Sequence, residues 1–317
     1  MSDATFEQGL PQAGQDGTRP AFWAQGRLGR SGVWLFLLSP LLAAAVLAVG
    51  ALILAGVFGV LAPSGIESAE ARDWRELPLD AALLGFAFTF LPFVLMLLGV
   101  LLATRIVHGR GPLSLMTAGP RFRWSQTAAS CAMIFILALA VLGLTLLISP
   151  QSIDFVLDPL AFLLFLPLVL ILVPLQVLAE EVLFRGYLLQ VVGRFCSHPL
   201  ALLLLPSGLF WAAHLGSDLT QQGGIWAILL YAVSALYLTY LALACDGLEH
   251  ALGVHLGINL FAFLIEGVAG SWYPTPTVFL AQEVDFRFSL LAMIAILAVH
   301  YWLVVRPDKA GAAAARS

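Results

Sequence analysis

Residues 160–190 read LAFLLFLPLVLILVPLQVLAEEVLFRGYLLQ. The first ionisable side chain in this stretch is Glu180, so twenty uncharged residues precede it. A helix needs about 20 apolar residues to cross the hydrocarbon core of a bilayer, and this run is long enough. Apolar runs elsewhere in the chain predict further helices. Together the predicted helices cover 33–62, 82–107, 127–148, 160–190, 199–215, 225–244, 248–270 and 287–305.

The composition of the whole chain agrees with a membrane protein. Of its 317 residues, 61% are hydrophobic and 11% are charged, against about a quarter charged in an ordinary soluble domain. No alternation of the barrel type occurs, and a helical bundle is the other way to satisfy backbone polar groups in lipid. The sequence therefore predicts an all-α, polytopic membrane bundle of about eight transmembrane helices, with the lipid bilayer as its surroundings.

Charge and cysteine usage exclude other classes of protein. The net charge is −4 and no basic block occurs, so nucleic acid is not an expected partner. Cys131, Cys196 and Cys245 are far apart and form no CxxC pair. This spacing indicates neither a disulfide framework nor a cysteine-rich metal site.

Lysine and arginine placement predicts the orientation of the bundle. If the N-terminus is cytoplasmic, twelve of the fifteen Lys and Arg residues fall on the cytoplasmic side. Positive loops stay in the cytoplasm, so both termini are expected there and the number of spans is expected to be even. Residues 1–31 are polar and precede the first apolar run without a cleavage-site pattern. We interpret them as a disordered cytoplasmic tail rather than a signal peptide.

Ionisable residues inside the predicted spans are informative, because each costs about 2.5–3.5 kcal/mol at the bilayer centre unless it is paired or hydrated. Adjacent helical residues point about 100° apart, whereas residues four apart share a face. Glu181 can therefore pair with Arg185 as a buried structural ion pair. Glu180 faces elsewhere, which suits a carboxylate that works as a general base in an interior cavity. Glu266 is a further, weaker candidate for a functional carboxylate.

Two later helices add imidazole and amide groups. His214 ends one predicted helix, while His255 and Asn259 are four apart on another and lie side by side. If the three helices meet, Glu180 and His214 polarise a water molecule, and His255 and Asn259 donate hydrogen bonds to the oxyanion of a cleaved amide.

A zinc site is the alternative chemistry for the same residues. Glu180, His214 and His255 form a His₂Glu set that zinc hydrolases use, with water as the fourth ligand. The sequence does not choose between a divalent metal and a metal-free water. Each group also has a structural interpretation, since membrane histidines and asparagines often join helices by hydrogen bonds. The joint occurrence of three such groups on three helices favours catalysis.

The three motifs resemble those of the CPBP family of intramembrane proteases, which includes the type II CAAX prenyl endopeptidases and the Abi proteins. The family pattern is EExxxR, FxxxH and HxxxN or HxxxD. This chain matches it without departure, over roughly 160–270, with the residues Glu180, Glu181, Arg185, Phe210, His214, His255 and Asn259.

The resemblance implies a role for each matched residue. Glu180 and His214 activate the water, His255 and Asn259 complete the site, and Glu181 with Arg185 supports it. Together with the apolar pattern, it divides the chain into four expected regions: a disordered cytoplasmic tail (1–31), N-terminal transmembrane helices (32–157), a catalytic core (158–270) that carries the resemblance, and a last transmembrane helix with a cytoplasmic tail (271–317).

The expected activity is that of an endopeptidase acting on a membrane-associated peptide or a lipidated protein. The Ala, Leu and Gly richness suggests a GC-rich bacterial genome and hence the inner membrane, where prenylated CAAX proteins are not an expected substrate. Two alternatives stay open, a non-catalytic binding or bacteriocin-immunity protein and a transporter. The absence of a recognisable internal repeat disfavours the transporter.

Overall fold

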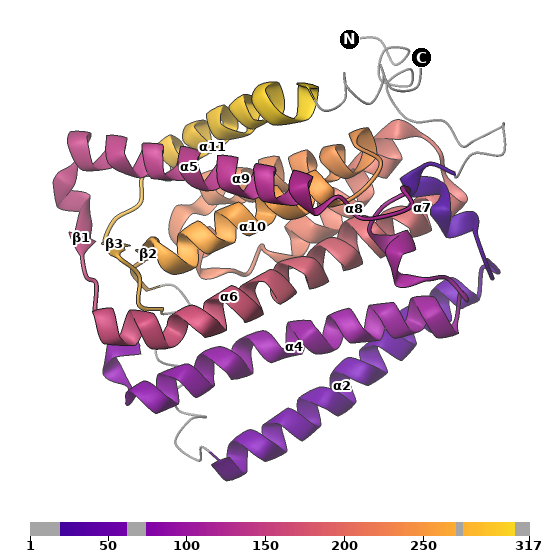
Figure 1. Cartoon of the computed structure of the whole chain (residues 1–317), viewed down its shortest axis with the longest axis horizontal. Helices are drawn as coiled ribbons and strands as arrows, with labels where there is room; N and C mark the ends of the chain where they lie inside the picture. Colours follow the sequence, from indigo (N-terminus) through magenta and orange to yellow (C-terminus); the bar gives the residue numbers. More distant parts are fainter. Residues whose placement is uncertain (1–19, 62–73, 271–274, 308–317) are drawn as a thin grey trace.

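The computed structural model describes residues 20–61, 74–270 and 275–307. They form a bundle of helices with a small sheet at one end (Figure 1). This confirms the polytopic helical fold predicted from the sequence. The α-helices are α2 (Leu35–Leu61), α4 (Leu79–Ile106), α5 (Trp124–Ile148), α6 (Pro159–Glu181), α7 (Leu189–Phe195), α8 (Pro199–Ala213), α9 (Asp218–Ala244), α10 (Glu249–Leu264) and α11 (Phe286–His300). Short 3-10 and π-helical turns are η1 (Phe22–Arg27), η2 (Trp74–Glu76), η3 (Pro112–Leu115), η4 (Pro150–Ser152), η5 (Val182–Leu188) and η6 (Tyr301–Val305).

Each of the eight predicted helices has a counterpart, but the helices differ in length. Among the described residues, six helical segments are long and apolar enough to cross a membrane. The helices α8 and α10 have only 15 and 16 residues. At 1.5 Å per residue they rise about 22 and 24 Å, less than the roughly 30 Å of a bilayer core. Helix α9 begins before the predicted 225–244 and is interrupted at Gly224, whose φ is 50°.

Helix α6 starts at a local capping signal and leads into the site. The side chain of Asp158 accepts hydrogen bonds from two backbone N–H groups of the first turn, and Pro159 stands at the first helical position, where no N–H is needed. Beyond Glu181 the chain continues through the π-helical turn η5 into α7, so the helical run reaches Phe195 rather than residue 190. Single π-helical turns are frequent at functional sites.

Helix α10 lies at the centre of the bundle, against α5, α6 and α9 (Figure 1). Two of its glycines determine which side of the helix faces α5. A Cβ on Gly257 would lie 2.8 Å from the carbonyl oxygen of Cys131, and one on Gly253 would meet the carbonyl oxygen of Thr127. Both glycines therefore have to face α5. His255 is two residues from each, about 200° around the helix, and so points to the opposite side, toward α6.

A three-stranded sheet closes one end of the bundle. Strand β3 (Phe279–Ala281) pairs antiparallel with β1 (Ile153–Phe155) and parallel with β2 (Glu266–Val268). The prediction that the seventh helix extends to residue 270 is wrong, because α10 ends at Leu264 and the chain turns into β2. The β-branched and aromatic residues of these short strands suit pairing, but runs of three residues are too short to show alternation.

The N-terminal segment differs from the expected disordered tail. Residues 1–19 lie outside the described part, but the helix η1 is packed against α7, and Phe22 is fully buried. The backbone N–H of Phe22 donates to the Asp246 carboxylate at 2.6 Å. A Cβ on Gly193 would meet the carbonyl oxygen of Trp23, so the glycine admits the segment. Burial of the Phe22 and Trp23 side chains offsets the conformational entropy that is lost when this otherwise polar stretch becomes ordered.

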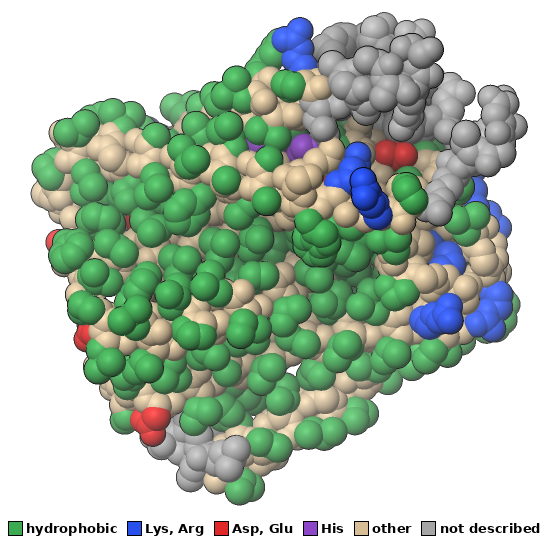
Figure 2. All heavy atoms as spheres, in the orientation of Figure 1, with side chains coloured by type: hydrophobic (Ala, Val, Ile, Leu, Met, Phe, Trp, Pro, Cys, Tyr) green, Lys and Arg blue, Asp and Glu red, His purple; other side chains and the backbone are tan. Residues whose placement is uncertain are grey.

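Charge separates along the bundle. Basic side chains gather at the end where α7 lies, and acidic ones mostly line the opposite end beside the sheet (Figure 2). The first residues of α2 and the last of α11 lie at the basic end (Figure 1). This arrangement agrees with an even number of crossings, and the cytoplasmic placement of the basic end stays a prediction.

Candidate active site

The six polar residues of the three motifs come from four neighbouring elements. The end of α6 provides Glu180 and Glu181, and the turn η5 provides Arg185. The residue after α8 is His214, and α10 provides the remaining two, His255 and Asn259. Helix α10 packs on α6, and α8 packs on α9 and on η5, so the elements meet inside the bundle.

Glu180 is buried, and only one of its two carboxylate oxygens has a hydrogen-bond partner. Its Oε1 atom accepts a hydrogen bond from the side-chain amide of Gln176 at 2.6 Å. Its Oε2 atom is buried and has no hydrogen-bond partner. Oε2 lies 3.6 Å from Nε2 of His255, longer than a hydrogen bond. A buried carboxylate oxygen without a partner is costly, and its position marks a place for a ligand or a water molecule.

The predicted ion pair is present. A guanidinium N–H of Arg185 donates to Oε1 of Glu181 at 2.7 Å, and both side chains are fully buried. The same oxygen lies 2.8 Å from Nδ1 of His255. An ionised carboxylate only accepts hydrogen bonds, so this contact assigns a proton to Nδ1. Glu181 thereby orients the His255 ring and directs Nε2 toward Glu180.

Arg185 has further contacts that fix it in place. It donates to the hydroxyl of Thr239 at 3.3 Å and to the carbonyl oxygen of Ala235 at 3.4 Å. Its guanidinium carbon lies 4.0 Å from the ring centroid of Phe210. A desolvated cation over an aromatic face is stabilised by the ring quadrupole. Phe210 of the FxxxH motif thus supports Arg185 as well as the two histidines.

His214 is held between aromatic rings at the end of α8. Its Nδ1 lies 2.8 Å from the carbonyl oxygen of Phe210, so Nδ1 carries a proton and Nε2 is left open. The ring lies 4.4 Å from that of Phe210 and 4.9 Å from that of Tyr231, at interplanar angles of 34° and 30°. The Phe210 ring also approaches His255, with 5.8 Å between centroids. One phenyl ring therefore contacts both imidazoles.

His214 lies at the end of the short helix α8. Helix α8 ends at Ala213, and after the four residues 214–217 the chain enters α9. His214 is the C-cap residue of α8, and its ring stacks with Phe210 and Tyr231 while the neighbouring Ala213 and Leu215 are exposed.

Asn259 joins the site through a residue that the motifs do not contain. Its side-chain N–H donates to the carbonyl oxygen of Gln176 at 3.0 Å, while the amide of Gln176 donates to Glu180. Gln176 precedes Glu180 by four residues and so shares its helical face. Sequence reasoning missed Gln176, Tyr231 and Thr239. The spacing of Gln176 was a usable signal, whereas nothing in the local sequence marks the other two.

The donor set does not form a metal cage as it stands. In the described ranges, no three His, Cys, Asp or Glu side chains are grouped so that they could hold a metal ion. Glu180 and His255 approach each other, and His214 stacks on the Phe210 ring. The zinc set of Glu180, His214 and His255 therefore stays a prediction, and no step below depends on a metal.

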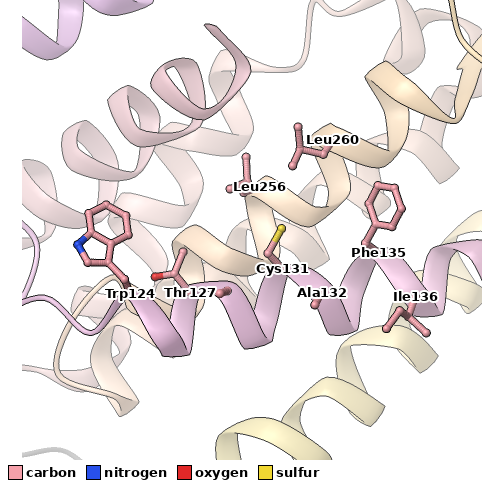
Figure 3. Close-up of a pocket in the computed structure, with 9 residues that line it drawn as sticks. Trp124, Thr127, Cys131, Ala132, Phe135, Ile136, Leu256 and Leu260 are labelled. Atoms are coloured by element: carbon pink, nitrogen blue, oxygen red, sulfur yellow. The ribbon is translucent and has the colours of Figure 1, made fainter. Parts of the chain in front are cut away.

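An apolar groove of about 660 Å³ lies between α10 and α5 (Figure 3). Leu256 and Leu260 line it from α10, each one residue after a polar site residue. The groove and the polar site thus occupy different faces of the same helix. The α5 side is lined by Trp124, Thr127, Ala128, Cys131, Ala132, Phe135 and Ile136.

Comparisons with known proteins support the motif assignment. Residues 160–261 match a family model described as type II CAAX prenyl endopeptidase Rce1-like, in agreement with the resemblance seen in the motifs. A protein of Bacillus subtilis (strain 168), described as uncharacterized protein YyaK, is 30% identical over 190 residues. The alignment covers 60% of this chain and 64% of that relative. No solved structure matches the chain.

Proposed function

We propose that this chain, whose residues 160–261 form an Rce1-like domain, is an intramembrane endopeptidase that hydrolyses a peptide bond of a membrane-associated substrate. The observation that supports this most directly is the unpartnered Oε2 of Glu180, buried and 3.6 Å from Nε2 of His255. A carboxylate held by one oxygen and open at the other is suited to receive a proton from water.

In the proposed reaction, a water molecule donates one hydrogen bond to Oε2 of Glu180 and is oriented by Nε2 of His214. The water oxygen attacks the scissile carbonyl carbon while Glu180 takes the proton. The C–N bond then breaks, and Glu180 returns that proton to the leaving amine. Proton transfer by one positioned group contributes roughly 10²- to 10⁴-fold to the rate.

His255 and Asn259 stabilise the oxyanion in this proposal. In its doubly protonated form, His255 donates Nδ1–H to Glu181 and directs Nε2–H into the space beside Glu180. Asn259 donates one N–H to Gln176 and keeps its second N–H for the substrate. Loss of one such oxyanion donor typically costs about 10²- to 10³-fold in kcat.

The proposed substrate is a peptide segment of a membrane-associated or lipidated protein. The polar site lies inside a bundle with an apolar outer surface, so a substrate reaches it from the bilayer or from its interface. We place the enzyme in a bacterial inner membrane with both termini cytoplasmic. The uneven distribution of basic and acidic side chains between the two ends supports this orientation (Figure 2).

The test compares purified wild type with Glu180→Gln in liposomes that contain a library of membrane-tethered peptides, some of them prenylated. The substitution keeps an oxygen that can accept from Gln176 and removes the base. We expect cleavage by the wild type and a loss of at least about 100-fold in Glu180→Gln. The matched control is Glu266→Gln, a partly buried carboxylate in strand β2, which should cleave like the wild type.

Two outcomes contradict the proposal. One is equal cleavage by wild type and Glu180→Gln, which would place the chemistry elsewhere or in a contaminant. The other is no cleavage by a folded wild type that binds a membrane partner equally well with and without Glu180, which would favour a non-catalytic binding or immunity protein.

A further inference from the structure

Gln176 connects two of the proposed catalytic residues. It lies one turn before Glu180 on α6 and is 7% exposed. Its amide nitrogen donates to Oε1 of Glu180 at 2.6 Å, and its amide oxygen accepts from Nδ2 of Asn259 at 3.0 Å. Both hydrogen bonds are short enough to be strong, and the first has a charged acceptor. Neither the family motifs nor the proposed reaction assigns a role to this residue.

The direction of these hydrogen bonds follows from the carboxylate. An ionised carboxylate has no proton to donate, so the NH₂ end of Gln176 has to face Glu180. The carbonyl end of Gln176 then faces Asn259, and a carbonyl only accepts, so Asn259 has to turn its own NH₂ group toward it. No other orientation of the two amides makes both hydrogen bonds. The charge of Glu180 thus determines the orientation of an amide on another helix.

This orientation has two consequences for the proposed reaction. Since Oε1 of Glu180 is occupied by Gln176, a proton taken from water goes to Oε2, on the side of His255. Since Asn259 turns its NH₂ group toward Gln176, the second N–H of that group is available to a substrate oxygen. A flipped Asn259 would present its carbonyl oxygen and repel the oxyanion.

We propose that Gln176 is a positioning residue for peptide hydrolysis, which holds the base through one oxygen and sets the amide of Asn259 in its donating orientation. This inference rests on the proposed function. It predicts that the side chain acts on kcat rather than on KM, because it contacts the catalytic groups and not the substrate.

Two variants of Gln176 separate positioning from packing. Gln176→Leu removes both hydrogen bonds at similar volume and should lower kcat about 10- to 100-fold, as expected for hydrogen bonds to a charged group, with little change in KM. Gln176→Glu keeps an oxygen for Asn259 but donates to Glu180 only when it is protonated. Its kcat relative to wild type should therefore rise as the pH falls, by up to about tenfold per pH unit, the limit for one proton.

The matched control is Gln190→Leu. Gln190 is also a buried glutamine with two hydrogen bonds, donating to the carbonyl oxygen of Ser114 and accepting from Arg110. This variant should lower thermal stability but leave kcat and the pH profile of the folded protein unchanged. A positioning role is contradicted if Gln176→Glu and Gln190→Leu show the same pH profile relative to wild type, or if Gln176→Leu keeps the wild-type kcat.

A measurement without substrate distinguishes failure of this inference from failure of the proposed function. The infrared carboxylate bands of Glu180, identified by their loss in Glu180→Gln, should shift in Gln176→Leu because one oxygen loses its donor. If the wild type cleaves no peptide but the bands shift, the proposed function fails and the hydrogen-bonded arrangement stands. If the bands are unchanged, the inference about Gln176 is overturned whatever the activity.

Discussion

Removing Arg185 should destabilise the protein more than removing its ion pair as a whole. The carboxylate of Glu181 accepts from Arg185 at 2.7 Å and from His255 at 2.8 Å, while its second oxygen is buried without a partner. In Arg185→Leu the carboxylate keeps one donor inside a fully buried site. Breaking a buried pair in this way costs about 3–5 kcal/mol, because a charge is left uncompensated.

The reverse change, Glu181→Gln, leaves a buried guanidinium with the hydroxyl of Thr239, the carbonyl of Ala235 and the ring of Phe210. These groups are neutral and cannot balance the charge, so we again expect about 3–5 kcal/mol. The double variant Glu181→Gln/Arg185→Leu removes both charges. Its cost should be smaller than that of either single change, because no uncompensated charge is left in the buried site.

The assay is a double-mutant cycle on the free energy of unfolding, measured by denaturant titration in mixed micelles, with cleavage measured in parallel. The double variant should regain stability but not activity, since His255 has lost the ionised acceptor for its Nδ1–H. Additive single and double changes would refute the claim that the two charges balance each other. Recovery of activity in the double variant would refute the role of Glu181 in orienting His255.

Three further predictions concern other parts of the molecule. Gly193→Ala places a Cβ against the carbonyl oxygen of Trp23, so it should cost about 1–3 kcal/mol and speed proteolysis of the N-terminal segment relative to wild type. Burial lowers the pKa of His108, which lies outside the membrane-spanning segments. At mildly acidic pH this histidine therefore binds a proton more readily in the unfolded chain than in the folded one, so the melting temperature should fall as the pH drops from 7 toward 5. The fall should be smaller in His108→Gln. The proposed reaction has no step that needs a metal, so chelators should leave cleavage unchanged. Loss of activity that zinc restores would favour the zinc set of Glu180, His214 and His255 instead.

The helical fold was accessible from sequence because lipid allows few alternatives. The long apolar runs, such as that of α6, leave an α-helix as the way to satisfy the backbone. The i, i+4 spacing predicted the pairing of Glu181 with Arg185 and the separate orientation of Glu180, and the structure has both. These features depend on local helical geometry alone.

Features that depend on tertiary contacts could not be predicted from the sequence. The early end of α10 reflects pairing of β2 with β3, which in turn pairs with the distant strand β1, and three-residue strands leave no periodic pattern. The burial of Phe22 depends on Gly193 and Asp246, distant residues that a polar N-terminal composition does not indicate. The stacking of Tyr231 on His214 is a contact between α9 and the end of α8, and no local sequence pattern marks it.

The shortness of α8 ties the site to the thickness of the surrounding lipid. Its outer side chains Leu204, Leu205 and Leu209 are about half exposed, so acyl chains cover this helix directly. A helix about 22 Å long beside longer ones creates a hydrophobic mismatch, which the bilayer relieves by thinning around it. His214, at the end of that helix, then lies beside a locally thinned region of the bilayer. Lipids with short acyl chains should let more water reach His214, and lipids with long acyl chains should let less water reach it.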